Sequence, residues 1–185
     1  MTGSVLLLAG AAALAVALVS YRRGSVWQRA QSVPDPILNS EEREAPGVRL
    51  GEPIGRLRIP RIGLDLMVIE GTRQEDLLKA PGHLTGSALP GAGDNCIIAG
   101  HRDLHFHRLG QLGPGDRVRL EAGGREMEYR VIRTRVVEAD DTSVLARAHE
   151  PLLTLITCYP FHHVGPAPRR FVVQASPMDA PGPAL

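Results

Sequence analysis

The chain of 185 residues lacks several features that would point to particular classes of function. Its formal net charge is only +1, so no excess of one charge indicates a nucleic acid or another polyanion as its partner. Aromatic residues make up 4% of the chain, and lysine occurs once, at Lys79. No internal repeat is visible. What remains is a chain with 43% hydrophobic residues, enough for one core of ordinary size plus an appendage.

Charge and proline are both absent from residues 5–19. A membrane-spanning helix needs about 20 apolar residues, with a lower range near 17, so this run lies at that limit. We expect residues 1–21 to form a membrane anchor or uncleaved signal, which enters the membrane through residues 5–21. A cleaved signal peptide and a buried helix are the alternatives, although the basic segment that precedes a signal core is missing. Arg22 and Arg23 follow the run and no cation precedes it, which by the positive-inside rule favours a cytoplasmic domain.

The remainder divides into a linker, a folded domain and a tail. Residues 22–49 mix proline, serine and charge without a sustained period, which is typical of a linker. Residues 50–176 carry the patterned sequence of the folded domain. Residues 177–185 are rich in proline and are expected to be disordered.

Residues 50–176 have the pattern of a β-domain. Apolar and polar residues alternate over 54–59, the run 96–99 is continuously apolar, and Gly123-Gly124 separates two further alternating segments. Strands are expected at 54–59, 64–69, 96–99, 117–121, 128–138, 152–157 and 171–175, short helices at 74–80 and 142–147, and a long loop at 81–94. Seven or eight short strands without sustained βαβ alternation predict a closed or sandwiched all-β domain.

Reactive side chains occur at three strand ends. Cys158 follows a predicted strand and precedes a turn, where a substrate can reach its thiol. His101 follows Gly100 just beyond another strand and can act as a proton donor. Arg169 and Arg170 open the last strand, where a guanidinium can present fixed donors to an oxyanion. Such a set can attack a carbonyl, protonate a leaving amine and stabilise the tetrahedral charge.

Each of these residues also has a structural interpretation. Cys96 and Cys158 could form a disulfide. His101 could bind a loop carbonyl, and Arg170 could be a surface charge. The spacing of His101, His105 and His107, with two further histidines at 162–163, could build a metal site, but it matches no strong zinc signature.

The segments TLITC at 154–158 and IIAGHRD at 97–103, with the arginine before FVV at 171–173, together resemble the sortases, which are cysteine transpeptidases of the bacterial surface. The resemblance covers residues 51–175, and CYPF followed by VGPAPRRF is most similar to the class D group. It implies an all-β fold, a closed sortase-type β-barrel of about eight strands with short helices, here after the N-terminal membrane-spanning helix.

The resemblance also implies roles for single residues. Cys158 would be the nucleophile and His101 the general acid and base. Arg170 would stabilise the oxyanion and substrate, with Arg169 as its rival, since strand alternation lets only one of the pair point inward. Thr157, Ala99 and Tyr159 would bind substrate beside the thiol. No metal or cofactor is implied.

The implied reaction begins at an LPxTG-like sorting signal of a surface protein. Cys158 would cleave after the threonine, form a thioacyl-enzyme, and pass the acyl group to an amine acceptor, either a cell-wall peptide or a protein lysine. Members of the family carry the catalytic domain outside the membrane, whereas the arginines after residues 5–19 favour the cytoplasm. We expect the location that is usual for the family. The alternative is a non-enzymatic, membrane-anchored β-domain with a Cys96–Cys158 disulfide, and counting free thiols separates the two.

Overall fold

The computed structural model describes residues 48–162 and 165–178. The expected anchor (1–21), nearly all of the linker (22–49) and most of the tail (177–185) therefore lie outside the described residues. No helix in the part of the chain that the structure describes is long and apolar enough to cross a membrane.

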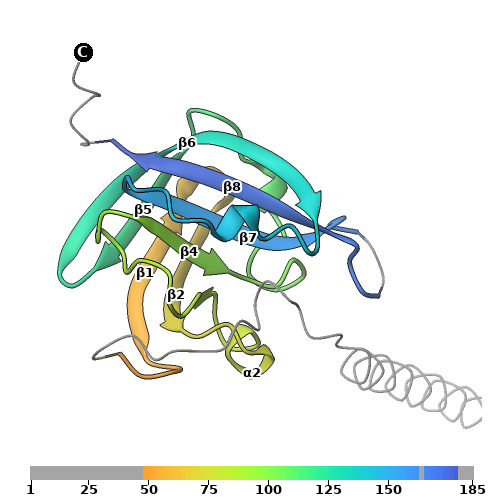
Figure 1. Ribbon diagram of the computed structural model, residues 1–185, viewed down its shortest axis with the longest axis horizontal. Coiled ribbons are helices and arrows are strands. Elements are labelled where there is room, and N and C mark those ends of the chain that lie inside the picture. The colour runs from red at the N-terminus through yellow and green to blue at the C-terminus, as the bar shows by residue number, and fades with distance from the viewer. Residues whose placement is uncertain (1–47, 163–164, 179–185) are drawn as a thin grey trace, which may run out of the picture. The chain divides into compact units, whose positions relative to one another are not determined.

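Eight strands form one closed barrel in the order β1-β2-β3-β4-β7-β8-β6-β5 (Figure 1). They are β1 (Pro53–Ile59), β2 (Leu64–Glu70), β3 (Gly82–His83), β4 (Asn95–Ala99), β5 (Arg117–Ala122), β6 (Arg125–Glu138), β7 (Leu152–Tyr159) and β8 (Arg169–Pro177). The prediction of a closed barrel of about eight strands is confirmed. Two neighbouring pairs, β2 with β3 and β4 with β7, are parallel, and the others are antiparallel.

The turn between β5 and β6 forms where the sequence predicts it. Ala122 pairs with Arg125 across Gly123 and Gly124, which have φ angles of 57° and 73°. Both glycines take the left-handed conformation that two-residue hairpin turns of this kind require. Figure 1 shows the long strand β6 curving over the barrel with β8 beside it.

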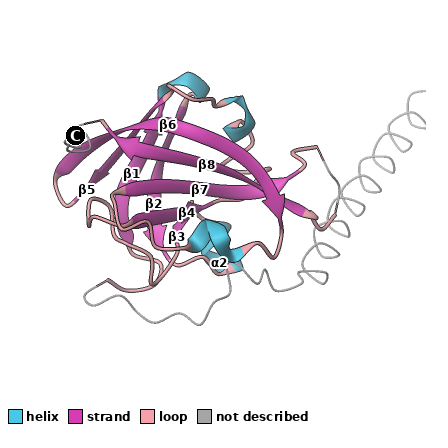
Figure 2. Cartoon of the chain, turned by 45° about the horizontal axis from the view of Figure 1, so that its top comes forward, coloured by secondary structure: helices cyan, strands magenta, loops and turns pink. Residues whose placement is uncertain are grey.

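The helical elements are shorter than expected. The helix predicted at 74–80 is α2 (Gln74–Leu77), and that at 142–147 is the 3-10 turn η3 (Thr142–Leu145), where the Asp141 side chain accepts from Ser143 N–H. Two more 3-10 turns are η1 (Pro60–Ile62) and η2 (Leu109–Gln111). Figure 2 shows helical elements at the periphery of a body made of strands, with α2 on the side of β3 and β4.

Two boundaries differ from the prediction. The loop expected at 81–94 contains β3, two residues that pair with both β2 and β4. The tail was expected to start at residue 177, but β8 includes Pro177, and Met178 N–H donates to the Glu128 carbonyl at 2.8 Å. The backbone is therefore ordered by pairing with β6 up to residue 178.

Apolar side chains gather in two clusters on opposite sides of the barrel wall. The larger fills the barrel and includes Leu153 and Leu155 of β7. The smaller includes Ile156 of β7, Val172 of β8 and Val144 of η3. Because successive strand residues point to opposite faces, the smaller cluster covers the outer face of β7 and β8 beneath η3.

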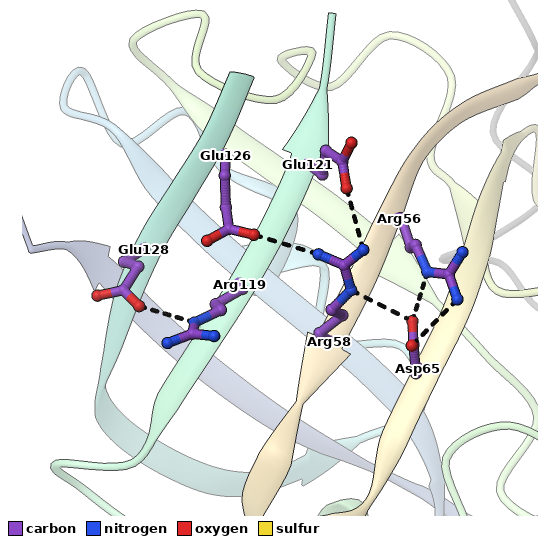
Figure 3. Close-up of polar contacts among 7 residues, drawn as sticks. All are labelled: Arg56, Arg58, Asp65, Arg119, Glu121, Glu126 and Glu128. Carbon is purple, nitrogen blue, oxygen red and sulfur yellow. Dashed lines mark hydrogen bonds and ion pairs between the residues drawn. The ribbon is translucent and has the colours of Figure 1, made fainter. Parts of the chain in front are cut away.

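A ladder of alternating charges covers the outer face of β2, β1, β5 and β6 (Figure 3). Arg56 donates to Asp65 at 2.6 Å, Arg58 contacts Glu121 and Glu126 at 3.2 and 3.1 Å, and Arg119 donates to Glu128 at 2.7 Å. These side chains are partly exposed, so each pair contributes little to stability, about 0–1 kcal/mol. The ladder identifies this wall as a solvated face.

Candidate active site

Cys158 lies near the end of β7 and is half-buried. It shares a face with Ile156, two residues earlier, and so lies on the outer face of the barrel wall at the edge of the smaller apolar cluster. Its thiol therefore lies outside the closed interior, where a peptide can approach it.

Arg170 lies directly across from Cys158. The two residues are register partners in the antiparallel pair β7–β8, and residues opposite each other in such a pair project from the same face. Arg170 is 6% exposed, and its Nη1 donates to the carbonyls of Ala167 at 3.1 Å and Arg169 at 2.9 Å. A buried, hydrogen-bonded guanidinium is thus held on the face of the thiol.

Arg169 has a different environment. It is exposed and pairs with Tyr159, and its guanidinium lies 5.3 Å from the centre of the Tyr159 ring. This cation–π contact lies on the face opposite to Cys158. Of the two arginines, Arg170 therefore lies on the face of Cys158 and Arg169 on the other, while the role expected for Arg170 stays a prediction.

His101 follows β4 on the other side of β7. The parallel register pairs Ala99 with Ile156, and Gly100 N–H donates to the Ile156 carbonyl at 3.1 Å. His101 lies two residues after Ala99, and Cys158 lies two residues after Ile156, so His101 is level with Cys158. The three predicted catalytic residues therefore come from neighbouring chain segments, His101 after β4, Cys158 in β7 and Arg170 in β8, at one level of the barrel wall.

The imidazole of His101 has an unusual environment. Burial lowers its pKa below the ordinary value, an effect that the nearby Asp103 carboxylate opposes. Its Nε2 atom is buried without a hydrogen-bond partner among the described residues. A buried polar atom left unsatisfied costs free energy, and its presence calls for an explanation such as a catalytic role or a bound water.

Thr157 and Gly100 bring the two chain segments together. The Thr157 hydroxyl donates to the Gly100 carbonyl at 2.7 Å. A Cβ atom at position 100 would approach the Phe106 ring to 2.7 Å, so only glycine fits there without displacement. These two contacts fix where the chain leaves β4 and therefore where His101 begins.

The three residues predicted to bind substrate differ in accessibility. Ala99 is 0% and Thr157 is 2% exposed, whereas Tyr159 is half-buried and packs with Phe161 and Phe171. Thr157 and Tyr159 both project from the face opposite to Cys158. Substrate binding stays a prediction for all three, and Thr157 has in addition the structural contact with Gly100.

The alternative of a Cys96–Cys158 disulfide is wrong for this structure. Neither cysteine is in a disulfide, and Cys96 is 1% exposed inside the barrel, level with Leu153. Cys158 lies five positions after Leu153 in β7, which is roughly 16 Å along the strand. A disulfide needs the two Cα atoms within about 7 Å, so it would require a different fold.

Two other histidines of the metal alternative, His105 and His107, bind backbone carbonyls. His105 Nε2 donates to the Leu77 carbonyl at 3.1 Å, and His107 Nδ1 donates to the Leu104 carbonyl at 3.2 Å. Within residues 48–162 and 165–178, no three His, Cys, Asp or Glu side chains gather in a way that could hold a metal ion.

Comparison with known proteins relates this arrangement to one family. A family model described as the sortase domain matches residues 57–178. The chain is 41% identical over 124 residues to Sortase D of Bacillus subtilis (strain 168), a match that covers 66% of this chain and 63% of that protein. The matches span 51% to 63% of the length of the curated relatives.

Solved structures agree in fold. A Clostridium perfringens Sortase D5 transpeptidase superposes with a TM-score of 0.65 at 26% identity, covering 71% of this chain and 82% of that one. A lid mutant of Sortase A from Corynebacterium diphtheriae superposes with a TM-score of 0.64 at 32% identity, covering 71% and 73%.

Proposed function

Because the chain belongs to the sortase family of cysteine transpeptidases, with a Sortase D among its relatives, we propose that it cleaves an LPxTG-like sorting signal after the threonine and transfers the acyl group to an amine. The observation that carries the proposal is the pairing of Cys158 with Arg170 across β7 and β8, with His101 level on the other flank. A half-buried nucleophile, a guanidinium and a proton carrier thus come from neighbouring segments at one level of the barrel wall, which supports the proposal.

The first half of the reaction forms a thioester. The Cys158 thiolate attacks the threonine carbonyl carbon, and the carbonyl π electrons move to its oxygen. Arg170 donates to this oxyanion, and its fixed planar fork suits that task. When the intermediate collapses, the carbon–nitrogen bond breaks and His101 gives its proton to the departing amine.

The second half reverses these steps with a different amine. An uncharged amino group of a cell-wall peptide or a protein lysine attacks the thioester carbon, and His101 takes the proton that this nitrogen loses. The carbon–sulfur bond then breaks, which releases the Cys158 thiolate and leaves a new amide. Water in place of the amine would give slow hydrolysis.

A peptide library tests the signal and the nucleophile together. We expect mass spectrometry to trap an acyl-enzyme on Cys158 with peptides that contain the signal. Cys158→Ala should abolish cleavage and transfer. Cys96→Ala should keep most activity, since burial raises the pKa of Cys96 to about 12 and leaves it a small buried hydrophobe. Equal loss of activity in two folded variants would overturn the assignment.

For location, we propose a membrane-anchored protein with its catalytic domain outside the cytoplasm. Support comes from family membership and from the apolar run of residues 5–19. Protease added to intact cells, with any outer membrane opened, should digest the domain. Protection of the domain would contradict this placement.

A further inference from the structure

Arg102 follows His101 directly but has no part in the chemistry proposed above. Its side chain is half-buried and reaches the connection between β7 and β8. Its Nη1 donates to the Pro160 carbonyl and its Nη2 to the Gly165 carbonyl, each at 2.9 Å. The acceptors are 58 and 63 residues away in sequence, so one guanidinium joins distant parts of the chain.

The position of these contacts relates them to the active site. Pro160 lies two residues after Cys158, and Arg102 lies one residue after His101. The ladder between β4 and β7 extends to the bond from Gly100 N–H to the Ile156 carbonyl, and both catalytic residues lie beyond it. Arg102 thus connects the segment after β4, which carries the proposed proton carrier, with the segment that follows the proposed nucleophile in β7.

We propose that Arg102 is a positioning residue, whose guanidinium fixes the segment after Cys158 against the segment that carries His101. Arg170 holds the later part of the same connection through the carbonyls of Ala167 and Arg169. The two arginines together hold the segment that follows the thiol at four carbonyls. The proposal rests on the proposed function for its effect on catalysis, and on geometry alone for its effect on the backbone.

The chemistry of the side chain explains why arginine is needed. The two carbonyls belong to different residues, and a planar guanidinium offers separate N–H groups in a fixed fork that can reach both. Hydrogen bonds from a charged donor are stronger than neutral ones, and partial burial shields these from water. A lysine ammonium carries the same charge on one mobile nitrogen and lacks the fixed fork that places a separate nitrogen at each carbonyl.

Arg102→Ala and Arg102→Lys test the proposal, with Arg108→Ala as matched control. Arg108 lies in the same connection after β4, and its Nη1 donates to a carbonyl at 3.3 Å, but that carbonyl belongs to Ile62. We expect both Arg102 variants to lower kcat with an LPxTG-like peptide on the order of 10- to 100-fold, because small displacements of reacting groups have effects of this size. KM should change little, and Arg108→Ala should resemble the wild type.

Two measurements without peptide separate positioning from substrate binding. Alkylation of Cys158 by iodoacetamide at fixed pH should slow in both Arg102 variants, since His101 is no longer held beside the thiol. Hydrogen exchange over residues 159–162 should become faster in both. Neither measurement should change in Arg108→Ala.

The outcomes decide the matter. Full recovery of kcat in Arg102→Lys would overturn the proposal, since charge alone would then suffice, and so would unchanged kcat and alkylation in Arg102→Ala. If Arg102→Ala does not fold, Arg102→Lys keeps the stem and the charge and carries the test. A wild type that forms no acyl-enzyme with any signal peptide defeats the proposed function, while alkylation and exchange still decide the role of Arg102.

Discussion

Two adjacent arginines at the start of β8 differ in the face from which they project. Arg170 is buried opposite Cys158, and Arg169 is exposed over Tyr159. Under the proposed mechanism, only Arg170 lies on the face where its N–H groups could reach an oxyanion formed beside Cys158. One residue of register thus separates the proposed catalytic position from a surface position.

We therefore predict that Arg170→Ala lowers the rate of acyl-enzyme formation on the order of 10²–10³-fold, by analogy with the loss of an oxyanion-hole donor. Arg170→Lys should fail to restore it, since an ammonium lacks the planar fork. Arg169→Ala is the control and should retain most activity. Rates are measured with one peptide for each folded variant, and an inactive Arg169→Ala beside a near-normal Arg170→Ala would move the role one position upstream.

The environment of His101 gives a prediction about pH. Burial lowers its pKa, so the acid limb of the kcat/KM profile should fall below the ordinary histidine value of about 6.5. Asp103 acts in the opposite direction, because its carboxylate favours the imidazolium. Asp103→Asn removes this attraction and should move the acid limb to still lower pH.

The measurement is the pH dependence of peptide cleavage for the wild type and Asp103→Asn. The acid limb of the kcat/KM profile reports the coupled titration of the thiol and the imidazole. The wild type and Asp103→Asn are therefore compared by the direction in which this limb shifts. An acid limb that moves to higher pH in Asp103→Asn would contradict the assignment of that limb to His101.

At the scale of elements, two consecutive residues at the start of β4 hold the segment that includes η3. Asp94 accepts from the N–H groups of Ala148 and His149 at 2.7 and 3.3 Å and from Arg147 at 2.7 Å. Asn95 Nδ2 donates to the carbonyls of Val144 and Ala146, at 3.3 and 3.1 Å. This segment places Val144 in the apolar cluster that contains Ile156. The hydrogen bonds of Asp94 and Asn95 therefore shape the surface next to the thiol.

Asp94→Ala should release residues 147–149. We expect several-fold faster hydrogen exchange at Ala148 and His149, and a higher KM for the peptide. Arg147→Ala is the control, since the Arg147 side chain is 81% exposed and such pairs contribute little. Unchanged exchange in Asp94→Ala would show that Asn95 and the apolar contacts suffice.

The contacts of the Asp94 carboxylate should depend on pH in a defined direction. Arg147 and three backbone N–H groups hold the pKa of Asp94 far below its ordinary value. A carboxyl whose pKa is lowered on folding contributes stability above its unfolded pKa, about 3.9, and loses it as pH falls toward the folded value. The contacts between Asp94 and residues 147–149 should therefore be intact at neutral pH and weaken only in acid.

At the scale of the whole molecule, closure of the barrel depends on its shortest strand. β3 has only two residues, and it links β2 to β4. His83 of β3 is fully buried, with Nδ1 2.7 Å from Glu70 Oε2 of β2 and Nε2 3.0 Å from the Ala88 carbonyl. Thr85 Oγ1 donates to the other Glu70 oxygen at 2.8 Å. Side-chain contacts thus extend a pairing that the short backbone ladder alone would leave weak.

His83→Ala should lower the free energy of unfolding by about 2–4 kcal/mol, because it leaves the Glu70 carboxyl buried without its closest partner. Urea denaturation followed by circular dichroism measures the change. His107→Ala removes an exposed histidine and should alter stability by less than about 0.5 kcal/mol. A similar loss in both variants would mean that the buried pair has no special role.

The sequence predicted the elements whose pattern is local. β1, β4 and the β5–β6 hairpin follow from alternation, a continuous apolar run and a glycine turn. β3 was missed because two residues carry no period. Strand alternation separated Arg169 from Arg170, and the same rule applied to Thr157 and Tyr159 would have placed them opposite Cys158. The contacts of Arg102 join residues 58 and 63 positions apart, and no local pattern predicts them.

Under the proposed thioester chemistry, the charge ladder of Figure 3 has a further consequence. It lies on β1 and its neighbours, halfway round the ring of strands from β7, and each of its cations is an arginine. A guanidinium stays protonated in proteins and is a poor nucleophile, whereas an uncharged lysine amine can attack a thioester. The wall therefore carries positive charge without offering an acceptor amine. Under the proposed chemistry, Lys79, the only lysine of the chain, is the one lysine side chain through which a copy of this protein could be acylated by itself or by another copy.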